Sequence, residues 1–358
     1  MPIAIAGGGE MKIVVIGAGA IGSVIAGYLC HANYHVQLIC KHREILEFIE
    51  NNGLRIEGIH DPIICYPEVV LDISQMVEQP DIIFLATRAN EVAELAQHLV
   101  PFLRDDTAVI TLQQGMCEPI VADIVRPDRT IGCVIGWTAT LLGPGRVAIT
   151  SEADFVVGEL DGEVTHRLLI IKSLLEKIFP VTISSNIYGA RFSNLILNAS
   201  LNTLAGICGL LWGELLRNNL ARAIALLAIT EGVTVANHLK IQLEPTANNI
   251  HLQKLVLNVT EGAARFRFAL FTKHLRLQLL GLKYQRVKSS SLQFLQRGKA
   301  TEIDYMNGYL VNKAQQYHLS LPVHQKLISL TKQIESGKLG ISPANLVHIV
   351  APDRSNPS

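Results

Sequence analysis

A glycine motif near the N-terminus constrains the fold more than any other feature of the sequence. Residues 17–22 read Gly-Ala-Gly-Ala-Ile-Gly and directly follow a short apolar run, Ile13 to Ile16. Between a strand and a helix, the first glycine allows a tight turn, the second lets the backbone approach a pyrophosphate, and the third lets helix and strand pack closely. The expected dinucleotide contacts are Gly17, Gly19, Ala20, Ile21 and Gly22. The simpler reading is a glycine-rich turn without a ligand.

The sequence from Met11 to about Pro180 alternates short β-branched runs with helical stretches. The runs are Lys12–Ile16, His35–Cys40, Asp81–Ala86, Thr107–Leu112 and Thr130–Trp137. Between them apolar residues recur with a period near 3.6, which is typical of helices that cover a parallel sheet. After Gly143-Pro144-Gly145, the runs Val147–Thr150 and Asp154–Val157 predict an antiparallel extension at the sheet's edge. We therefore expect an α/β Rossmann domain over residues 11–185.

The second half of the chain has a different pattern. Beyond Ile183 the strand-like runs fade and helix-like segments dominate, which predicts an all-α domain over residues 186–345. A chain of 358 residues exceeds one comfortable hydrophobic core, and 49% apolar with 17% charged residues excludes disorder. We expect the active cleft between the two domains, beyond the carboxyl ends of the strands.

The end of the second predicted strand indicates which dinucleotide is bound. An acidic residue there would hold the adenosine ribose, but the sequence offers Lys41-His42-Arg43. Lys41 and Arg43 favour a 2′-phosphate and hence NADPH. Glu44 comes next and could face the ribose of NAD instead, and basic residues that open a surface helix are often simply solvated.

Three asparagines on one face of a predicted helix are a second candidate site. Asn194, Asn198 and Asn202 recur at i, i+4 and i+8 in an otherwise apolar segment. Asparagine is a mediocre helix former, so the stripe needs a reason. One reading is a polar ligand between the domains, and the other is a set of buried amides that satisfy backbone groups at a domain junction.

Charge and cysteine usage restrict the partners. Lysine plus arginine balance aspartate plus glutamate at 31 each, so no global field attracts nucleic acid or membranes. The segment 262–301 holds nine bases and no acid, for which we expect steering of an anion and not nucleic-acid binding. Six scattered cysteines without a CxxC pair read as reduced thiols of a cytoplasmic protein with no zinc site.

One stretch, Phe192 to Gly213, has no charge over 22 residues and is long enough to cross a bilayer. Its serine, threonine and asparagine side chains would be costly against lipid, so we expect a buried helix and no membrane span. The ten residues before Met11 lack the features of a signal peptide.

The order of several motifs resembles the ketopantoate reductases, also called 2-dehydropantoate 2-reductases. The motifs are residues 17–22, Gln113–Met116, Gly143–Gly145, Asn198–Asn202, Ser289–Gln293 and Thr301–Gly308. The resemblance implies a two-domain NADPH-dependent reductase of a small anionic 2-oxo acid, acting in pantothenate biosynthesis. It further implies that Asn198 and Asn202 face the substrate, that Ser290 holds its carboxylate, and that Glu302 bonds a hydroxyl or the catalytic acid. A homodimer through the helical domain is an option that stays open.

The chain also departs from the family pattern. The catalytic lysine of the family stands four residues before the first asparagine of the pair, where this chain has Asn194. On the cofactor side Arg88 replaces a lysine and Gln114 replaces an asparagine. Two functions follow: a reductase with an altered active site, whose proton comes from another group such as Lys288, Arg191 or Glu302, or a non-catalytic NADPH-binding sensor or scaffold protein.

Overall fold

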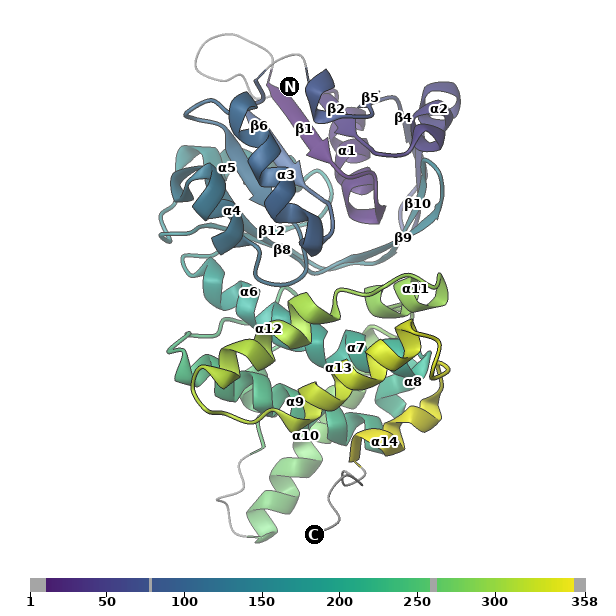
Figure 1. Cartoon of the computed structure of the whole chain (residues 1–358), viewed down its shortest axis with the longest axis vertical. Helices are drawn as coiled ribbons and strands as arrows, with labels where there is room; N and C mark the ends of the chain where they lie inside the picture. The colour runs from purple at the N-terminus through teal and green to yellow at the C-terminus, as the bar shows by residue number, and fades with distance from the viewer. Residues whose placement is uncertain (1–10, 77–78, 258–262, 351–358) are drawn as a thin grey trace. The chain divides into compact units, whose positions relative to one another are not determined.

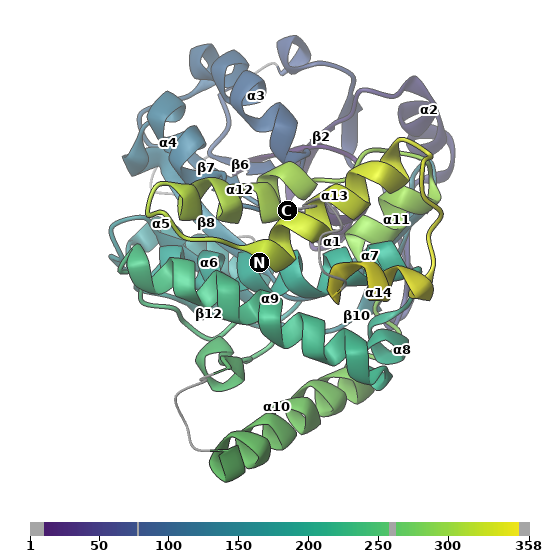
Figure 2. The ribbon, with the colours of Figure 1, turned by 60° about the horizontal axis from the view of Figure 1, so that its bottom comes forward.

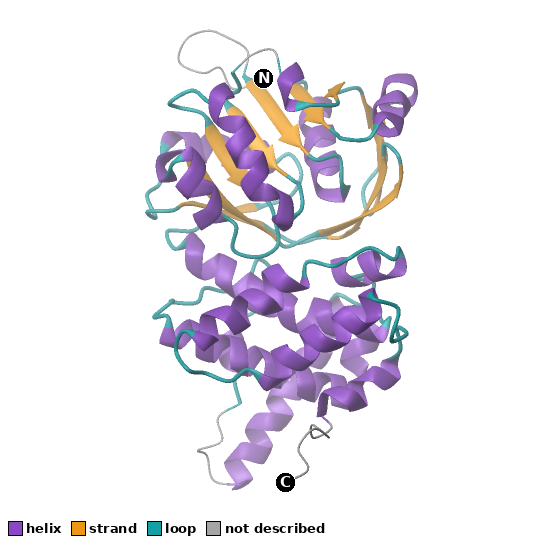
Figure 3. Cartoon of the chain, in the orientation of Figure 1, coloured by secondary structure: helices purple, strands orange, loops and turns teal. Residues whose placement is uncertain are grey.

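The computed structural model describes residues 11–76, 79–257 and 263–350, and these form two compact units. The first unit consists of residues up to Arg191 together with Ala247–Asn249, and the second of Phe192–Thr246 and the residues from Ile250 onward. Each unit is described by itself. Both sheets belong to the first unit, whereas the described part of the second unit is helical (Figure 3). The expected fold class, a Rossmann-like α/β domain plus an all-α domain, is therefore confirmed.

The main sheet of the first unit is doubly wound. Its strand order is β12-β11-β8-β7-β6-β1-β2-β5, and every neighbouring pair is parallel except β11 with β8. The order reverses between β1 and β6, and the glycine motif follows β1 at this switch point, where ligands of open α/β sheets bind. The strands are β1 (Lys12–Ile16), β2 (His35–Ile39), β5 (Glu68–Val70), β6 (Ile82–Leu85), β7 (Ala108–Thr111), β8 (Thr130–Ile135), β11 (Phe155–Glu159) and β12 (Val181–Ile183).

Both faces of this sheet are covered because side chains alternate along each strand. In β1, Ile13 and Val15 join one apolar cluster with α1 and α5, while Val14 and Ile16 join another with α3 and α4 (Figure 1). Near-continuous apolar strands are what a sheet buried on both faces requires. The helices of this unit are α1 (Ala20–His31), α2 (Arg43–Asn52), α3 (Val92–Leu99), α4 (Glu118–Val125) and α5 (His166–Leu175).

A smaller second sheet corrects one expectation. It has the order β4-β3-β10-β9 and packs against α1. Its strands are β3 (Leu54–Gly58), β4 (Ile63–Cys65), β9 (Thr138–Gly143) and β10 (Arg146–Ser151). The run Val147–Thr150 thus lies in this second sheet and not at the edge of the main one. The run Asp154–Val157 does form an antiparallel strand of the main sheet, β11. It is not the edge strand, because β12 is the outermost strand on that side.

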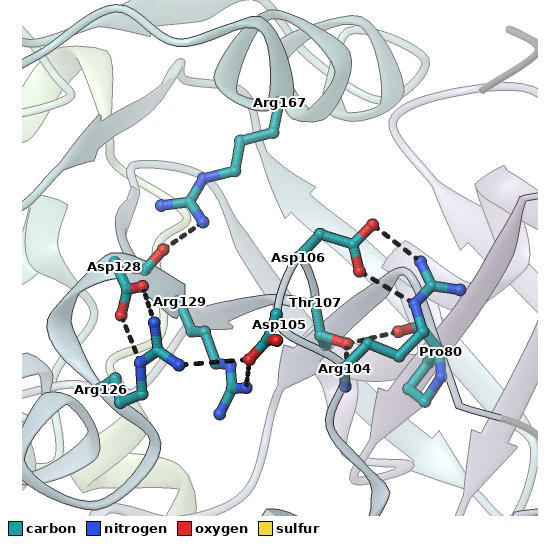
Figure 4. Close-up of polar contacts among 9 residues, drawn as sticks. All are labelled: Pro80, Arg104, Asp105, Asp106, Thr107, Arg126, Asp128, Arg129 and Arg167. Carbon is teal, nitrogen blue, oxygen red and sulfur yellow. Dashed lines mark hydrogen bonds and ion pairs between the residues drawn. The ribbon is translucent and has the colours of Figure 1, made fainter. Parts of the chain in front are cut away.

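A cluster of charged side chains lies at the end of the main sheet where its strands begin, opposite the end that carries the glycine motif. The loop that leads into β7 is joined to the loop before β8 by the ion pair of Asp105 with Arg129, and to the loop before β6 by a hydrogen bond from the Thr107 hydroxyl to Pro80 O (Figure 4). Arg104 bonds Asp106 at 2.9 Å and also pairs with Asp81, and Arg129 bonds Asp105 at 2.9 Å. These loops precede the strands, whereas ligands bind beyond the strands' carboxyl ends. We therefore interpret the cluster as structural.

The second unit is built around the uncharged stretch that begins at Phe192. The stretch is not one helix: it runs through α6, the π-helical turn η5 (Asn198–Asn202) and α7, and reaches the start of α8. The helices are α6 (Ile187–Leu197), α7 (Thr203–Cys208), α8 (Trp212–Arg217), α9 (Asn219–His238), α10 (Ala263–Lys283), α11 (Ser290–Gln296), α12 (Ile303–Gln315), α13 (Pro322–Glu335) and α14 (Leu346–Val350). Within this unit α10 projects away from the other helices (Figures 1 and 2).

One helix among the described residues, α9, is long and apolar enough to cross a bilayer. Most of its apolar window is buried inside the helical unit, which is the usual situation of a core helix.

Candidate functional site

The glycine motif forms a tight turn between β1 and α1. Gly17 has a φ of +113°, a conformation that side chains disfavour, and its N–H donates to Ile39 O at 2.9 Å. A Cβ on Gly22 would stand 1.9 Å from Gly17 O, so only glycine lets the helix approach the turn this closely. The sequence thus builds a helix that starts directly at the switch point.

The same turn presents backbone amides that could bind an anion. Gly19 is exposed, and a Cβ built on it meets no atom within 4 Å. The amides of Ala20, Ile21 and Gly22 lie in the first helical turn, where no intrahelical acceptor exists, and Gly19 offers no side chain to cap them. Thr87, next to Gly17 beyond β6, has a buried hydroxyl without a hydrogen-bond partner among the described residues. Donors without acceptors at a helix N-terminus fit a pyrophosphate.

The basic residues after β2 lie at the same carboxyl edge of the sheet. Lys41 and Arg43 are exposed, and Arg43 opens α2. The Lys41 ammonium is 3.1 Å from Glu91 Oε2, with 74% of the side chain exposed. Exposed ion pairs contribute about 0–1 kcal/mol, so this contact is easily exchanged for a stronger anion.

Arg88 and Gln114 lie beyond the carboxyl ends of β6 and β7. Arg88 precedes a short 3-10 turn, Ala89–Glu91, and is half-buried, as is Gln114. Both residues therefore lie at the same end of the sheet as the glycine turn. Their neighbour Gln113 is buried and donates from its amide to Leu85 O at 2.9 Å, which fixes the loop to β6.

A buried ion pair that the sequence did not indicate anchors the loop that contains Gln113 and Gln114. Arg191 and Glu118 are each 3% exposed, and Arg191 Nε lies 2.5 Å from Glu118 Oε1. The Arg191 guanidinium also donates to three carbonyls, those of Gln113, Gly115 and Cys133, at 2.5–2.9 Å. These contacts hold the Arg191 guanidinium, and an arginine is not an acid near neutral pH, so it does not serve as the alternative proton donor.

The asparagine stripe of the second unit contains a π-helical turn. Asn198 and Asn202 do meet: the Asn202 amide donates to Asn198 Oδ1 at 3.0 Å. Trp212 Nε1 donates to Asn202 Oδ1 at 3.1 Å, and the Ser289 hydroxyl donates to Asn202 O at 3.1 Å. Asn202 is buried by these contacts, whereas Asn198 is half-buried and keeps an accessible face.

The π turn is stabilised by side chains from distant elements. Asn307 on α12 is fully buried and donates to Ala199 O at 2.8 Å, while accepting from the Thr203 hydroxyl at 2.9 Å. A π turn displaces the regular carbonyl-to-amide pattern, and Asn307 supplies a side-chain partner. Asn307 also contacts His324 Nδ1 at 2.9 Å, and His324 Nε2 bonds Ala228 O at 3.0 Å. Burial lowers the pKa of His324 to about 4, so the ring is neutral.

Ser290 and Glu302 are placed by the two helices next to this turn. Ser289 caps α11 by accepting from Leu292 N at 3.1 Å, so Ser290 follows the residue that bonds Asn202. Glu302 is the N-cap residue of α12, the helix that carries Asn307. The structure thus gathers the asparagine pair and the serine run, with Glu302 at the start of an adjoining helix.

Asn194 lies one turn before Asn198 on α6 and is half-buried. Its side chain makes no hydrogen bond to the described residues. An amide can donate a hydrogen bond but is not an acid near neutral pH. Among the residues that the structure describes, no cluster of three or more metal-ligating side chains occurs.

The comparisons with known proteins agree with this architecture. Residues 13–162 match the model of the family described as ketopantoate reductase PanE/ApbA, and residues 186–335 match the model of its C-terminal domain. The chain belongs to the ketopantoate reductase family. The resemblance drawn from the sequence motifs is thereby confirmed at family level, and the chain is an oxidoreductase homologue.

Individual relatives are distant but match over the full length. The 2-dehydropantoate 2-reductase of Archaeoglobus fulgidus is 27% identical over 332 residues, which cover 91% of this chain and 98% of the relative. The crystal structure of a PanE/ApbA family ketopantoate reductase from Ralstonia eutropha has a TM-score of 0.76 and 24% identity, covering 92% of this chain and 99% of the other. D-mandelate dehydrogenase in complex with NADH has a TM-score of 0.73 and 25% identity, covering 91% and 99%.

Proposed function

We propose that this protein is an NADPH-dependent reductase of a small 2-oxo acid, similar to 2-dehydropantoate 2-reductase but with an altered proton donor. The observation that carries the proposal is the hydrogen-bonded pair Asn198 and Asn202 on a π turn, in a chain that also carries a glycine turn suited to a dinucleotide. In this proposal residues 11–185 form the cofactor domain and residues 186–345 the substrate domain.

The cofactor side is supported by the residues around the glycine turn. The amides after Gly19 would hold the pyrophosphate, and Lys41 with Arg43 would pair with a 2′-phosphate. Arg88 and Gln114, at the edge beyond β6 and β7, would contact the nicotinamide end. The relative D-mandelate dehydrogenase was solved with NADH, so the choice between NADPH and NADH is a point for experiment. When bound, the dinucleotide supplies a hydride.

The substrate side is supported by the donors around the π turn. Asn198 keeps an accessible face while Asn202 fixes its amide through a bond at 3.0 Å, so the pair is preorganised to hydrogen-bond an oxo or hydroxyl group. Ser290, at the N-terminus of α11, would bind the carboxylate, and Glu302 would bond a hydroxyl or act as the acid. These assignments follow the family pattern residue by residue.

The residue at position 194 determines how the product alkoxide obtains its proton. Hydride addition to a ketone leaves an alkoxide, which needs a proton, and the family's lysine position is Asn194 here. Asn194 can orient the oxygen but cannot supply the proton. Since Arg191 is engaged by Glu118, the proton must come from Glu302, from the half-buried Lys288 or from water. If none serves, the second function applies: an NADPH-binding sensor or scaffold protein without turnover.

Two measurements on the full chain separate these functions. Titration with NADPH and with NADH tests the cofactor cradle, and oxidation of NADPH over a panel of 2-oxo acids tests turnover. Turnover on any panel member supports the reductase. Tight NADPH binding without turnover, together with binding of a 2-oxo acid to the NADPH complex, supports the sensor. Absence of dinucleotide binding contradicts both.

The remaining partner proposals concern the surface and the setting of the protein. The exposed residues Phe271, Leu275, Leu279 and Leu282 form an apolar stripe along α10, which supports a homodimer through the helical domain. Phe271→Glu should then shift the protein to monomer in light scattering, and a wild-type monomer would end the proposal.

The bases of segment 262–301 would steer an anionic substrate, and we propose no nucleic acid or membrane partner. A cytoplasmic location is proposed from the metabolic relatives.

A further inference from the structure

Two cysteines of the first unit lie against each other, although they are 35 positions apart in sequence. Cys30 belongs to the last turn of α1, and Cys65 ends β4 of the second sheet. The Cys65 sulfur lies 3.4 Å from the position of a Cβ on Gly27, one helical turn before Cys30. Cys30, three residues after Gly27 on the same face of α1, packs against the apolar cluster that contains Cys65. A Cβ on Gly27 would stand 2.3 Å from Ile56 Cδ1, so the missing side chain lets β3, the neighbour of β4, come close to the helix.

The two thiols differ in accessibility and in acidity. Cys30 is partly exposed, whereas Cys65 is 6% exposed and its thiol also contacts Leu54 O at 3.7 Å. The hydrogen bond from Cys65 lowers the pKa of Cys30 to about 7, and the same contact raises the pKa of Cys65. Cysteine thiolates are the reactive form, so Cys30 is the nucleophile of the pair and Cys65 remains a thiol.

The other described cysteines do not share this environment. Cys133 and Cys208 are buried, and burial raises the pKa of each to about 12. Burial also raises the pKa of Cys40. An accessible thiolate beside a second thiol is the arrangement of peroxide-sensitive cysteines, in which the second thiol resolves the first oxidation product.

We propose that Cys30 and Cys65 form a reversible peroxide-sensitive dithiol that ties the last turn of α1 to β4 when it is oxidised. The Cys30 thiolate attacks one oxygen of hydrogen peroxide, the S–O bond forms, the O–O bond breaks, and the other oxygen leaves as hydroxide, which takes a proton from the acid form of the buffer. Cys65 then loses its proton and attacks the Cys30 sulfur, the S–S bond forms, the S–O bond breaks, and water leaves. The two thiols lose two electrons to the peroxide, and a dithiol reductant restores them. The site is independent of the proposed reductase activity.

The test is peroxide treatment of the reduced full chain at neutral pH, followed by alkylation of free thiols and mass spectrometry of the digest. We expect a Cys30–Cys65 linked peptide that dithiothreitol removes. Because the neighbouring Cys65 thiol lowers the pKa of Cys30, a larger fraction of Cys30 is ionised at pH 7 than of an ordinary cysteine, so Cys30 should react faster than the buried cysteines. Cys65→Ser should stop at a Cys30 sulfenic acid that a 1,3-dione traps.

Controls keep the outcome decisive. Cys133→Ser removes a buried thiol outside the pair and should leave the linkage unchanged, whereas Cys30→Ser should abolish it. Cys65→Ala serves if Cys65→Ser does not fold, and the wild-type linkage needs no variant at all. A wild-type digest in which Cys30 is oxidised but unlinked to Cys65, or in which Cys30 reacts no faster than the buried cysteines, would overturn the proposal.

Discussion

Arg191→Met should destabilise the first unit strongly, because it removes one half of a buried ion pair. The substitution keeps an unbranched side chain of similar length but leaves Glu118, itself 3% exposed, without its partner at 2.5 Å. It also removes the donor of three carbonyls, including Gln113 O at 2.8 Å and Cys133 O at 2.9 Å. Breaking a buried pair by removing one partner typically costs about 3–5 kcal/mol. We expect the free energy of unfolding of this unit to fall by that amount.

The assay uses the fact that the chain has two tryptophans, one in each unit. Trp137 lies in the first unit and Trp212 in the second, so urea unfolding in a Trp212→Phe background reports on the first unit through Trp137 fluorescence. The control is Arg191→Met combined with Glu118→Gln, which removes the unpaired charge and should recover part of the loss. A loss below about 1 kcal/mol for Arg191→Met, the value of an exposed pair, would refute the argument.

Two further predictions concern the cofactor and the pH dependence of stability. Lys41→Ala with Arg43→Ala should remove a preference for NADPH over NADH of about 10–100-fold, the value of one to two charge-assisted bonds, and equal affinities in the unchanged protein would contradict it. The pKa of His324 is lowered to about 4 from 6.5, so its contribution to stability is present above pH 6.5 and is lost, by about 3 kcal/mol, as the pH falls through 4. Urea unfolding from pH 7 to 4 measures this in a Glu231→Gln background, because burial raises the pKa of Glu231 to about 7 and that carboxyl acts in the opposite direction. An equally steep profile after His324→Gln would contradict the assignment.

The Rossmann half of the fold was predictable because its signals are local. The glycine motif, the β-branched runs and the helical period between them all depend on neighbouring residues. The second sheet was missed because β4 is only three residues long and β3 pairs with β10 from far along the chain. Short strands of this kind carry too few residues to show a period.

The residue types of the candidate site could be predicted from the sequence, but the contacts that hold these residues in place could not. The asparagine spacing indicated a shared face, and Asn198 and Asn202 do bond each other. The π turn between them could not be read from the sequence, because Asn307, more than a hundred positions away, supplies the bond to Ala199 O. The Arg191 and Glu118 pair was hidden for the same reason: each residue looks like an ordinary surface charge until its distant partner is known.

Asn194→Lys is the change that tests the altered active site most directly. Asn194 is half-buried on α6, one turn before Asn198, and its amide makes no hydrogen bond to the described residues, so a lysine there would break no hydrogen bond. A positioned general acid contributes about 10²–10⁴-fold to a rate, so the variant should reduce 2-oxo acids at least about a hundredfold faster than the unchanged protein. Asn194→Met, which matches the lysine side chain in length but carries no proton, is the control and should stay slow. The gain should appear in kcat and follow the ionisation of the new amine in the pH profile, whereas an effect on packing alone would appear in both variants. Family-level turnover by the unchanged protein would contradict the reasoning, and loss of that turnover in Lys288→Met would then identify Lys288 as the donor.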